Sequence, residues 1–184
     1  MKQVFQAAQQ VQDFFDENDW EFCFIGGVAL QRWAKPRLTN DVDLTLLTGF
    51  GSEEIFIDKI LQKFRSRLEN PKEFALRSRV LLLQIENVGI DISLGALFFE
   101  ESAVRRATKF EFLKNISLKT CSAEDLIVYK AFADRLQDWA DIQNILSVQS
   151  KLDWTYIDEQ LAPLVELKEA PEILVKLENL RAEL

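Results

Sequence analysis

The sequence contains no histidine among its 184 residues. This absence excludes mechanisms that need an imidazole, including Ser-His and Cys-His nucleophile pairs and histidine general bases. It also excludes zinc sites with imidazole ligands, and two cysteines are too few for a site of four thiolates. Any catalysis must therefore use carboxylates, lysine, arginine or hydroxyl groups.

Cysteine and long apolar runs are also scarce. Cys23 and Cys121 lie far apart in apolar surroundings, and no charged, apolar leader precedes them. We therefore expect both to be reduced core residues of a cytoplasmic protein, since secreted domains use cysteines in disulfide frameworks. No apolar run approaches the roughly 20 residues that cross a bilayer, so we expect no membrane partner.

Positive charge is in deficit, with 22 Lys and Arg against 30 Asp and Glu and a net charge of -8. This balance opposes broad, non-specific binding to nucleic acid. It leaves open a small nucleotide or a locally docked RNA end. Between residues 72 and 119 the basic residues are concentrated, namely Arg77, Arg79, Arg105, Arg106, Lys109 and Lys114. They either dock a phosphate-rich acceptor or serve as surface charges paired with nearby glutamates.

Hydrophobic residues make up 48% of the chain, enough for one buried core or a core with a small helical appendage. Periodicity predicts helices over 2–18, 28–35 and roughly 53–68, and strands over about 20–25, over 41–47 and twice within 79–95 around an Asn-Val-Gly turn. The remainder is predicted to be helical, with one long helix over 122–146 that begins at a Ser122/Asp125 capping box. Asp153 is expected to cap a further helix.

These elements predict an α+β fold. We expect a small mixed β-sheet core over residues 1–120, with helices on one face, and a C-terminal helical layer over 121–184 packed on it as a single compact unit.

Two aspartates, Asp41 and Asp43, interrupt the apolar strand predicted over 41–47. Residues i and i+2 of a strand share a face, so both carboxylates are directed to one place. There they repel each other unless they are protonated, solvated or bridged by a cation. Asp91 lies between Ile90 and Ile92 of a later strand in the same manner. Such carboxylates either hold one or two hard ions such as Mg2+ or simply face solvent.

Gly26 and Gly27 follow the first predicted strand and precede a helix. Such a turn presents backbone N–H groups and the positive end of a helix, which suit a phosphate. The alternative is an ordinary tight turn.

Together, the strand, the Gly-Gly turn, the short helix, the Arg-x-Thr-x-Asp-x-Asp motif at 37–43 and the later aspartate resemble the nucleotidyltransferase superfamily that includes DNA polymerase beta. The "IGGVALQRW...PRLTNDVDLTLL" block is most similar to the branch of AbiEii/AbiGii-type toxin nucleotidyltransferases, and the resemblance covers residues 22 to 146. It implies a Mg2+-dependent enzyme that moves a nucleoside monophosphate from a nucleoside triphosphate (NTP) to a hydroxyl acceptor.

The resemblance also implies residue roles. Gly26 and Gly27 would contact the triphosphate, Asp41 and Asp43 would hold the metal ions, and Asp91 would complete the metal site and help activate the attacking hydroxyl.

Three further positions bear on the resemblance. Arg37 and Thr39 precede the aspartate pair as in this branch, and Arg37 either reaches a phosphate or solvates a loop. The superfamily usually has Ser or Thr directly after the glycines. Val28 stands there in this chain, so one hydroxyl ligand for phosphate is missing.

The toxin-like branch also shows a basic residue followed by Asp-x-x-Asp on a helix after the core. Lys130, Arg135, Asp138 and Asp141 fit this pattern, and on one continuous helix Lys130, Asp134, Asp138 and Asp141 would share a face. We expect Lys130 to contact the triphosphate, with Asp138 and Asp141 orienting Lys130 or Arg135. A solvated helix face with i,i+4 pairs is the alternative.

The acceptor and partners stay open at this point. The resemblance implies an RNA, protein or small-molecule acceptor, the last as in antibiotic-modifying enzymes, and a cognate antitoxin as a further partner. A non-catalytic binding module that keeps the fold is the alternative consistent with Val28.

Overall fold

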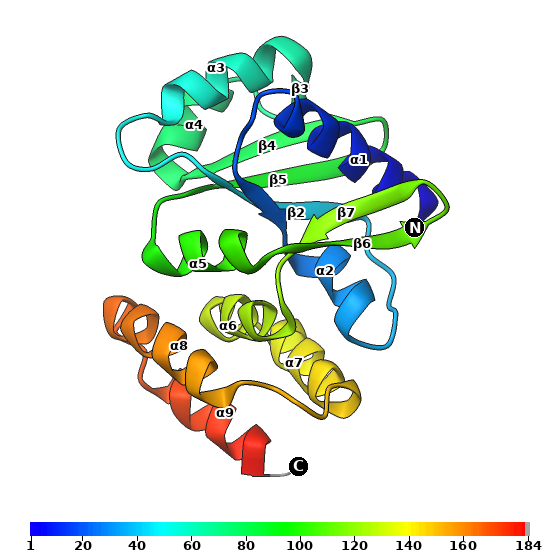
Figure 1. The fold of residues 1–184 in the computed structure, drawn as a ribbon. Helices are drawn as coiled ribbons and strands as arrows, with labels where there is room; N and C mark the ends of the chain where they lie inside the picture. Colours follow the sequence, from blue (N-terminus) through cyan, green and yellow to red (C-terminus); the bar gives the residue numbers. More distant parts are fainter. Residues whose placement is uncertain (183–184) are drawn as a thin grey trace. The chain divides into compact units, whose positions relative to one another are not determined.

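The computed structural model describes residues 1–182 (Figure 1). Its contacts divide the chain into two compact units, the first made of residues 1–28 and 37–121 and the second of residues 29–36 and Ser122 onward. None of the helices within the described residues has the length and apolar character needed to span a membrane.

The first unit is built on a seven-stranded mixed sheet with the strand order β3-β4-β5-β2-β1-β7-β6. The strands β2 and β5 pair in parallel, as do β1 and β7, and the other neighbours are antiparallel. The mixed sheet with its helices confirms the predicted fold class. The strands are β1 (Phe22–Phe24), β2 (Asp41–Leu47), β3 (Arg65–Ser66), β4 (Val80–Ile85), β5 (Val88–Gly95), β6 (Thr108–Leu113) and β7 (Ile116–Thr120).

Five helices have all or part of their length in this unit. They are α1 (Lys2–Asp16), the start of α2 (Gly26–Trp33), α3 (Glu53–Lys63), α4 (Pro71–Ser78) and α5 (Phe98–Arg106). Helix α1 buries an apolar stripe that includes Val11 and Phe15 in the same core cluster as Leu44 of β2 and Ile90 of β5. Because side chains alternate along a strand, the aspartates of β2 and β5 lie on the opposite face of the sheet from this core.

Three predictions for this unit were wrong. The helix predicted over 53–68 ends at Lys63, and β3 follows it and pairs with β4. The turn between β4 and β5 uses Glu86, which has a φ of +51°, while Gly89 lies inside β5. The β6–β7 hairpin was predicted as helix, although the alternation of apolar residues on both sides of Asn115 is typical of strands.

The second unit is helical. It contains the remainder of α2 together with α6 (Ala123–Ala133), α7 (Leu136–Val148), α8 (Trp154–Lys168) and α9 (Glu172–Ala182). The segment 29–36 is tied to α7 and its end, because Gln149 Nε2 donates to the Trp33 carbonyl at 2.9 Å and Asn144 Nδ2 donates to the Lys35 carbonyl at 3.0 Å.

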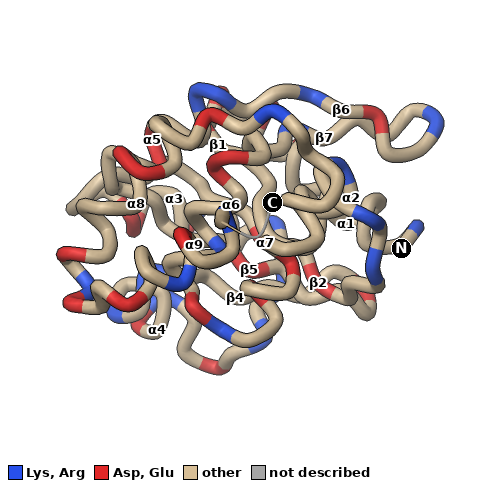
Figure 2. Tube along the Cα trace, turned by 90° about the horizontal axis from the view of Figure 1, so that it is seen from below, with Lys and Arg blue, Asp and Glu red and all other residues tan. Residues whose placement is uncertain are grey.

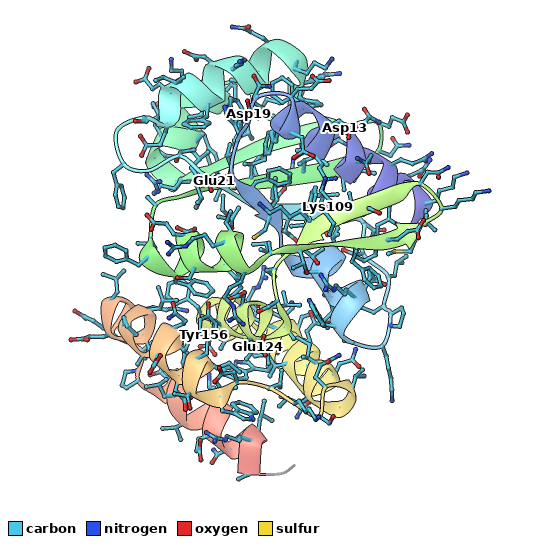
Figure 3. The ribbon with its side chains drawn as sticks, viewed as in Figure 1. Asp13, Asp19, Glu21, Lys109, Glu124 and Tyr156 are labelled. Atoms are coloured by element: carbon cyan, nitrogen blue, oxygen red, sulfur yellow. The ribbon has the colours of Figure 1, made fainter. Side chains whose placement is uncertain are left out.

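Side-chain caps begin two of these helices, as the sequence predicted. The amide of Asp125 donates to Ser122 Oγ at 3.1 Å, and the amide of Tyr156 donates to Asp153 Oδ1 at 3.0 Å. The Tyr156 hydroxyl in turn donates to Asp125 Oδ1 at 2.6 Å, linking α8 to the start of α6 near Glu124 (Figure 3). The single helix predicted over 122–146 was wrong, because the backbone turns at Asp134, which has a φ of +59°.

Candidate functional site

The three predicted aspartates occupy neighbouring positions on one face of the sheet. In the parallel pairing of β2 with β5, Asp43 is opposite Asp91 and Asp41 is opposite Gly89. Paired residues on adjacent strands share a face and the strands lie about 4.8 Å apart. We call Asp41, Asp43 and Asp91 the acidic patch. The structure thus brings together on one face the residues that the sequence separated by up to 50 positions.

Two carboxylates of the acidic patch, those of Asp41 and Asp91, have different partners. Thr39 is buried, and its hydroxyl donates to Asp41 Oδ1 at 2.8 Å. Asp91 forms an ion pair with the guanidinium of Arg67. Burial raises the pKa of Asp91, whereas the charge and the hydrogen bond of Arg67 lower it. The negative charge of Asp41 raises it again, and the resulting pKa lies above the ordinary value.

The two glycines set helix α2 directly against this patch. At Gly26, where φ is +53°, an added Cβ would lie 2.7 Å from the Cβ of Asp43. At Gly27 it would lie 2.8 Å from the Cβ of Thr39. Only residues without a side chain allow this approach. The positive end of α2, which favours negative charge, therefore begins beside Asp43.

The donor set of the patch suits a divalent cation. All three groups are carboxylates on adjacent strands, and hard oxygen ligands are those that Mg2+ prefers. Within residues 1–182, however, no three such side chains are gathered in a formed metal site. In this structure the Thr39 hydroxyl bonds Asp41 and the Arg67 guanidinium bonds Asp91. The residues fit a cation once Arg67 is displaced from Asp91.

The other predicted residues near the motif have separate contacts. The guanidinium of Arg37 donates to the backbone carbonyl of Leu38 at 3.1 Å. Val28 is fully buried in the core cluster of the sheet. The residue that stands where the superfamily places a hydroxyl is therefore a core side chain.

Lys130 lies in the second unit, where α6 faces α7. Its ammonium donates to Asp138 Oδ1 at 3.1 Å and to Asp141 Oδ2 at 2.6 Å, and Arg135 Nε donates to Asp138 Oδ2 at 2.6 Å. The side chain of Lys130 is only 6% exposed. Burial raises the pKa of Asp138, but the hydrogen bonds and charges of Arg135 and Lys130 outweigh it and hold the pKa below its ordinary value.

This arrangement corrects one prediction. Lys130 and the aspartates do not share a face of one helix, because the chain breaks at Asp134 and the groups meet from two helices. Asp138 and Asp141 both accept hydrogen bonds from Lys130, and their role in orienting it stays a prediction.

Arg67 is the residue of the site that sequence reasoning missed. It follows β3, in a segment that helical periodicity had assigned to 53–68. No motif marks it, and the only signal was an unexplained basic residue.

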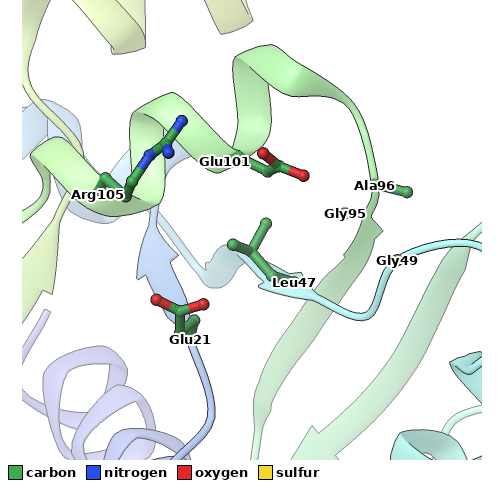
Figure 4. Close-up of a pocket in the computed structure, with 7 residues that line it drawn as sticks. All are labelled: Glu21, Leu47, Gly49, Gly95, Ala96, Glu101 and Arg105. Carbon is green, nitrogen blue, oxygen red and sulfur yellow. The ribbon is translucent and has the colours of Figure 1, made fainter.

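A small pocket lies at the other end of β2 (Figure 4). Its volume is about 220 Å³, and it is lined by Glu21, Leu47, Gly49, Gly95, Ala96, Glu101 and Arg105. Leu47 and Gly95 lie four positions along their strands from Asp43 and Asp91, which is about 13 Å. The pocket is thus separate from the acidic patch, and its charged lining residues are two glutamates and one arginine.

Comparison with known proteins identifies the fold and the family of this chain. Two solved structures share the fold. The antibiotic-resistance factor ANT(2'')-Ia is 15% identical, with a TM-score of 0.52 over 92% of each chain. An antigenic nucleotidyltransferase-like protein from Paracoccidioides brasiliensis is 14% identical, with a TM-score of 0.52 over 95% of this chain and 92% of that one. No curated protein sequence matched. Residues 11–183 match the family described as "Nucleotidyl transferase AbiEii toxin, Type IV TA system", and the chain belongs to this nucleotidyltransferase family.

Proposed function

We propose that this protein transfers a nucleoside monophosphate from an NTP to a hydroxyl of a cellular RNA or protein, with Mg2+ as the metal and pyrophosphate as the leaving group. The observation that carries the proposal is the register of β2 and β5, which pairs Asp43 with Asp91 beside the start of α2. Nucleotidyl transfer in general follows from the family.

The acidic patch supplies the catalytic groups in this proposal. Asp41 and Asp43 would hold Mg2+, which when bound neutralises phosphate charge and polarises the phosphoryl group. Asp91 would complete the ligand set and accept the proton of the attacking hydroxyl.

The start of α2 supplies the phosphate contacts. Gly26 and Gly27 let the helix end approach the patch, and a helix N-terminus favours an anion. Thr39 positions Asp41 through its hydrogen bond, and Arg37 is proposed as a further phosphate contact. The role of Lys130 as a triphosphate contact stays a prediction from the sequence.

The family is described as a toxin of a toxin-antitoxin system. This description supports an acceptor inside the target cell and a cognate antitoxin as a partner. A toxin must modify a component of the cell, so we favour RNA or protein over a small molecule as the acceptor. The small-molecule alternative and a non-catalytic nucleotide-binding module are distinguished by the following experiment.

The purified protein is incubated with Mg2+, each α-labelled NTP in turn, and total cellular RNA or protein. We expect label on one macromolecular fraction, reduced about 100-fold or more in Asp43→Asn, because a lost metal ligand costs more than the 10–100-fold of a lost supporting contact. The matched control Asp158→Asn, at an exposed carboxylate of α8, should behave as wild type.

Three outcomes would contradict parts of the proposal. If Asp43→Asn transfers label as well as wild type, the acidic patch does not take part in catalysis. Label only on an added small-molecule antibiotic would indicate a small-molecule enzyme. Mg2+-dependent thermal stabilisation by NTP without transfer to any acceptor would indicate a binding module.

A further inference from the structure

Arg67 places a permanent positive charge within the acidic patch. Its guanidinium forms an ion pair with Asp91. It also lies over Gly89, where an added Cβ would be 3.0 Å from its Nη1 atom. Gly89 is paired with Asp41, and Asp91 is paired with Asp43. The guanidinium therefore lies over Gly89, which is the one residue of these two pairs that has no side chain.

The backbone around Arg67 is anchored, while its side chain is partly exposed to solvent. The Arg67 amide donates to the Leu82 carbonyl at 3.1 Å, and the neighbouring Ser66 hydroxyl donates to the same carbonyl at 3.0 Å. The side chains of Arg67 and Asp91 are 33% and 36% exposed. Ion pairs at this exposure contribute little to stability, so the fold does not need this one.

We propose that Arg67 is a built-in counter-ion that competes with the divalent metal for Asp91. The proposal rests on the proposed function, since it takes Asp91 as a metal ligand. Arginine stays charged at every working pH, so its competition is constant. Metal entering alone must displace the guanidinium, and the site therefore holds a free ion weakly. The negative phosphates of a metal-bound nucleotide would draw the displaced guanidinium away and remove this competition.

The test measures Mn2+ binding by isothermal titration calorimetry without nucleotide, so it does not depend on turnover. Arg67→Gln should bind Mn2+ about 5-fold more tightly than wild type, the order expected when one unit charge near the ion is removed from a solvated site. Arg67→Lys keeps the charge and should stay near wild type. Arg77→Gln, an equal charge change at an exposed position of α4, is the matched control.

The outcomes separate this inference from the proposed function. Equal or weaker Mn2+ binding by Arg67→Gln, with binding lost in Asp43→Asn, overturns the counter-ion role and leaves the proposed function standing. Absence of Mn2+ binding in wild type and in Arg67→Gln, with both folded by circular dichroism, overturns the counter-ion role, and the transfer assay with Asp43→Asn then decides the proposed function separately. A 5-fold gain in Arg77→Gln as well would assign the effect to net charge and overturn the inference.

Discussion

Gly26 combines two constraints at one residue, a left-handed backbone and close contact with Asp43. Its φ is +53°, and an added Cβ would be 2.7 Å from Asp43 Cβ. Gly49 has a similar backbone, with a φ of +68°, but nothing lies within 4 Å of its Cβ position. The pair thus separates backbone strain from steric contact.

We predict that Gly49→Ala costs about 1–2 kcal/mol of unfolding free energy, the cost of the left-handed conformation. Gly26→Ala should cost about 1–3 kcal/mol more, because the methyl group overpacks against Asp43. Urea denaturation of both variants measures the difference. Equal losses would show that Asp43 yields to the methyl group and that the approach of α2 is not tight.

At the scale of elements, the break between α6 and α7 makes a buried ionic cluster. Lys130, Asp138 and Asp141 have side chains only 6%, 3% and 2% exposed. Removing a buried charge leaves its partners uncompensated. By contrast, the pair of Lys176 with Asp134 is 46% and 21% exposed, and exposed pairs are worth about 0–1 kcal/mol.

We predict that Lys130→Met destabilises the protein by about 3–5 kcal/mol, whereas Lys176→Met costs about 1 kcal/mol or less. The double variant Lys130→Met/Asp141→Asn should recover part of the loss, because one uncompensated charge is removed. Chemical denaturation of the three variants provides the measurement. A Lys130→Met loss no larger than that of Lys176→Met would mean that water reaches the cluster.

The elements also show what the sequence could predict. Strand β2 and the positions of Asp41 and Asp43 follow from local alternation, which needs no tertiary information. The break at Asp134 could not be predicted this way, because a non-glycine residue with positive φ leaves no strong sequence signal. Arg67 was missed for a related reason. Its contact with Asp91 depends on the order of strands β3, β4 and β5, which is a property of the folded sheet.

At the scale of the whole molecule, the basic residues concentrated in the sequence are dispersed by the fold. Arg77 and Arg79 adjoin β4, while Lys109 and Lys114 belong to the β6–β7 hairpin, and four strands separate β4 from β6 (Figure 2). Arg79 forms an ion pair with Glu53. Lys109, labelled in Figure 3, has its Nζ atom 3.6 Å from Asp16 Oδ2. Arg77 and Arg79 therefore do not share one basic surface with Lys109 and Lys114.

The chain crosses between its two units at 28/29, 36/37 and 121/122, and this connectivity bears on how the molecule folds. Ala29 and Leu30 are fully buried but group with the helical unit, whereas the adjacent Val28 belongs to the core of the sheet. Division at residue 120, as the sequence suggested, therefore separates part of α2 from its partners.

We predict that a fragment of residues 1–121 exposes Leu30 and binds the dye ANS, which the full chain does not. Leu30→Gln should then have opposite consequences in the two contexts. In the full chain it should cost about 2–5 kcal/mol, the range for losing a buried large side chain, as measured by urea denaturation. In the fragment it should lower ANS fluorescence without loss of stability, because an apolar side chain is removed from a water-exposed surface. A fragment that binds no ANS and is destabilised by Leu30→Gln as strongly as the full chain would show that Leu30 packs within the sheet unit.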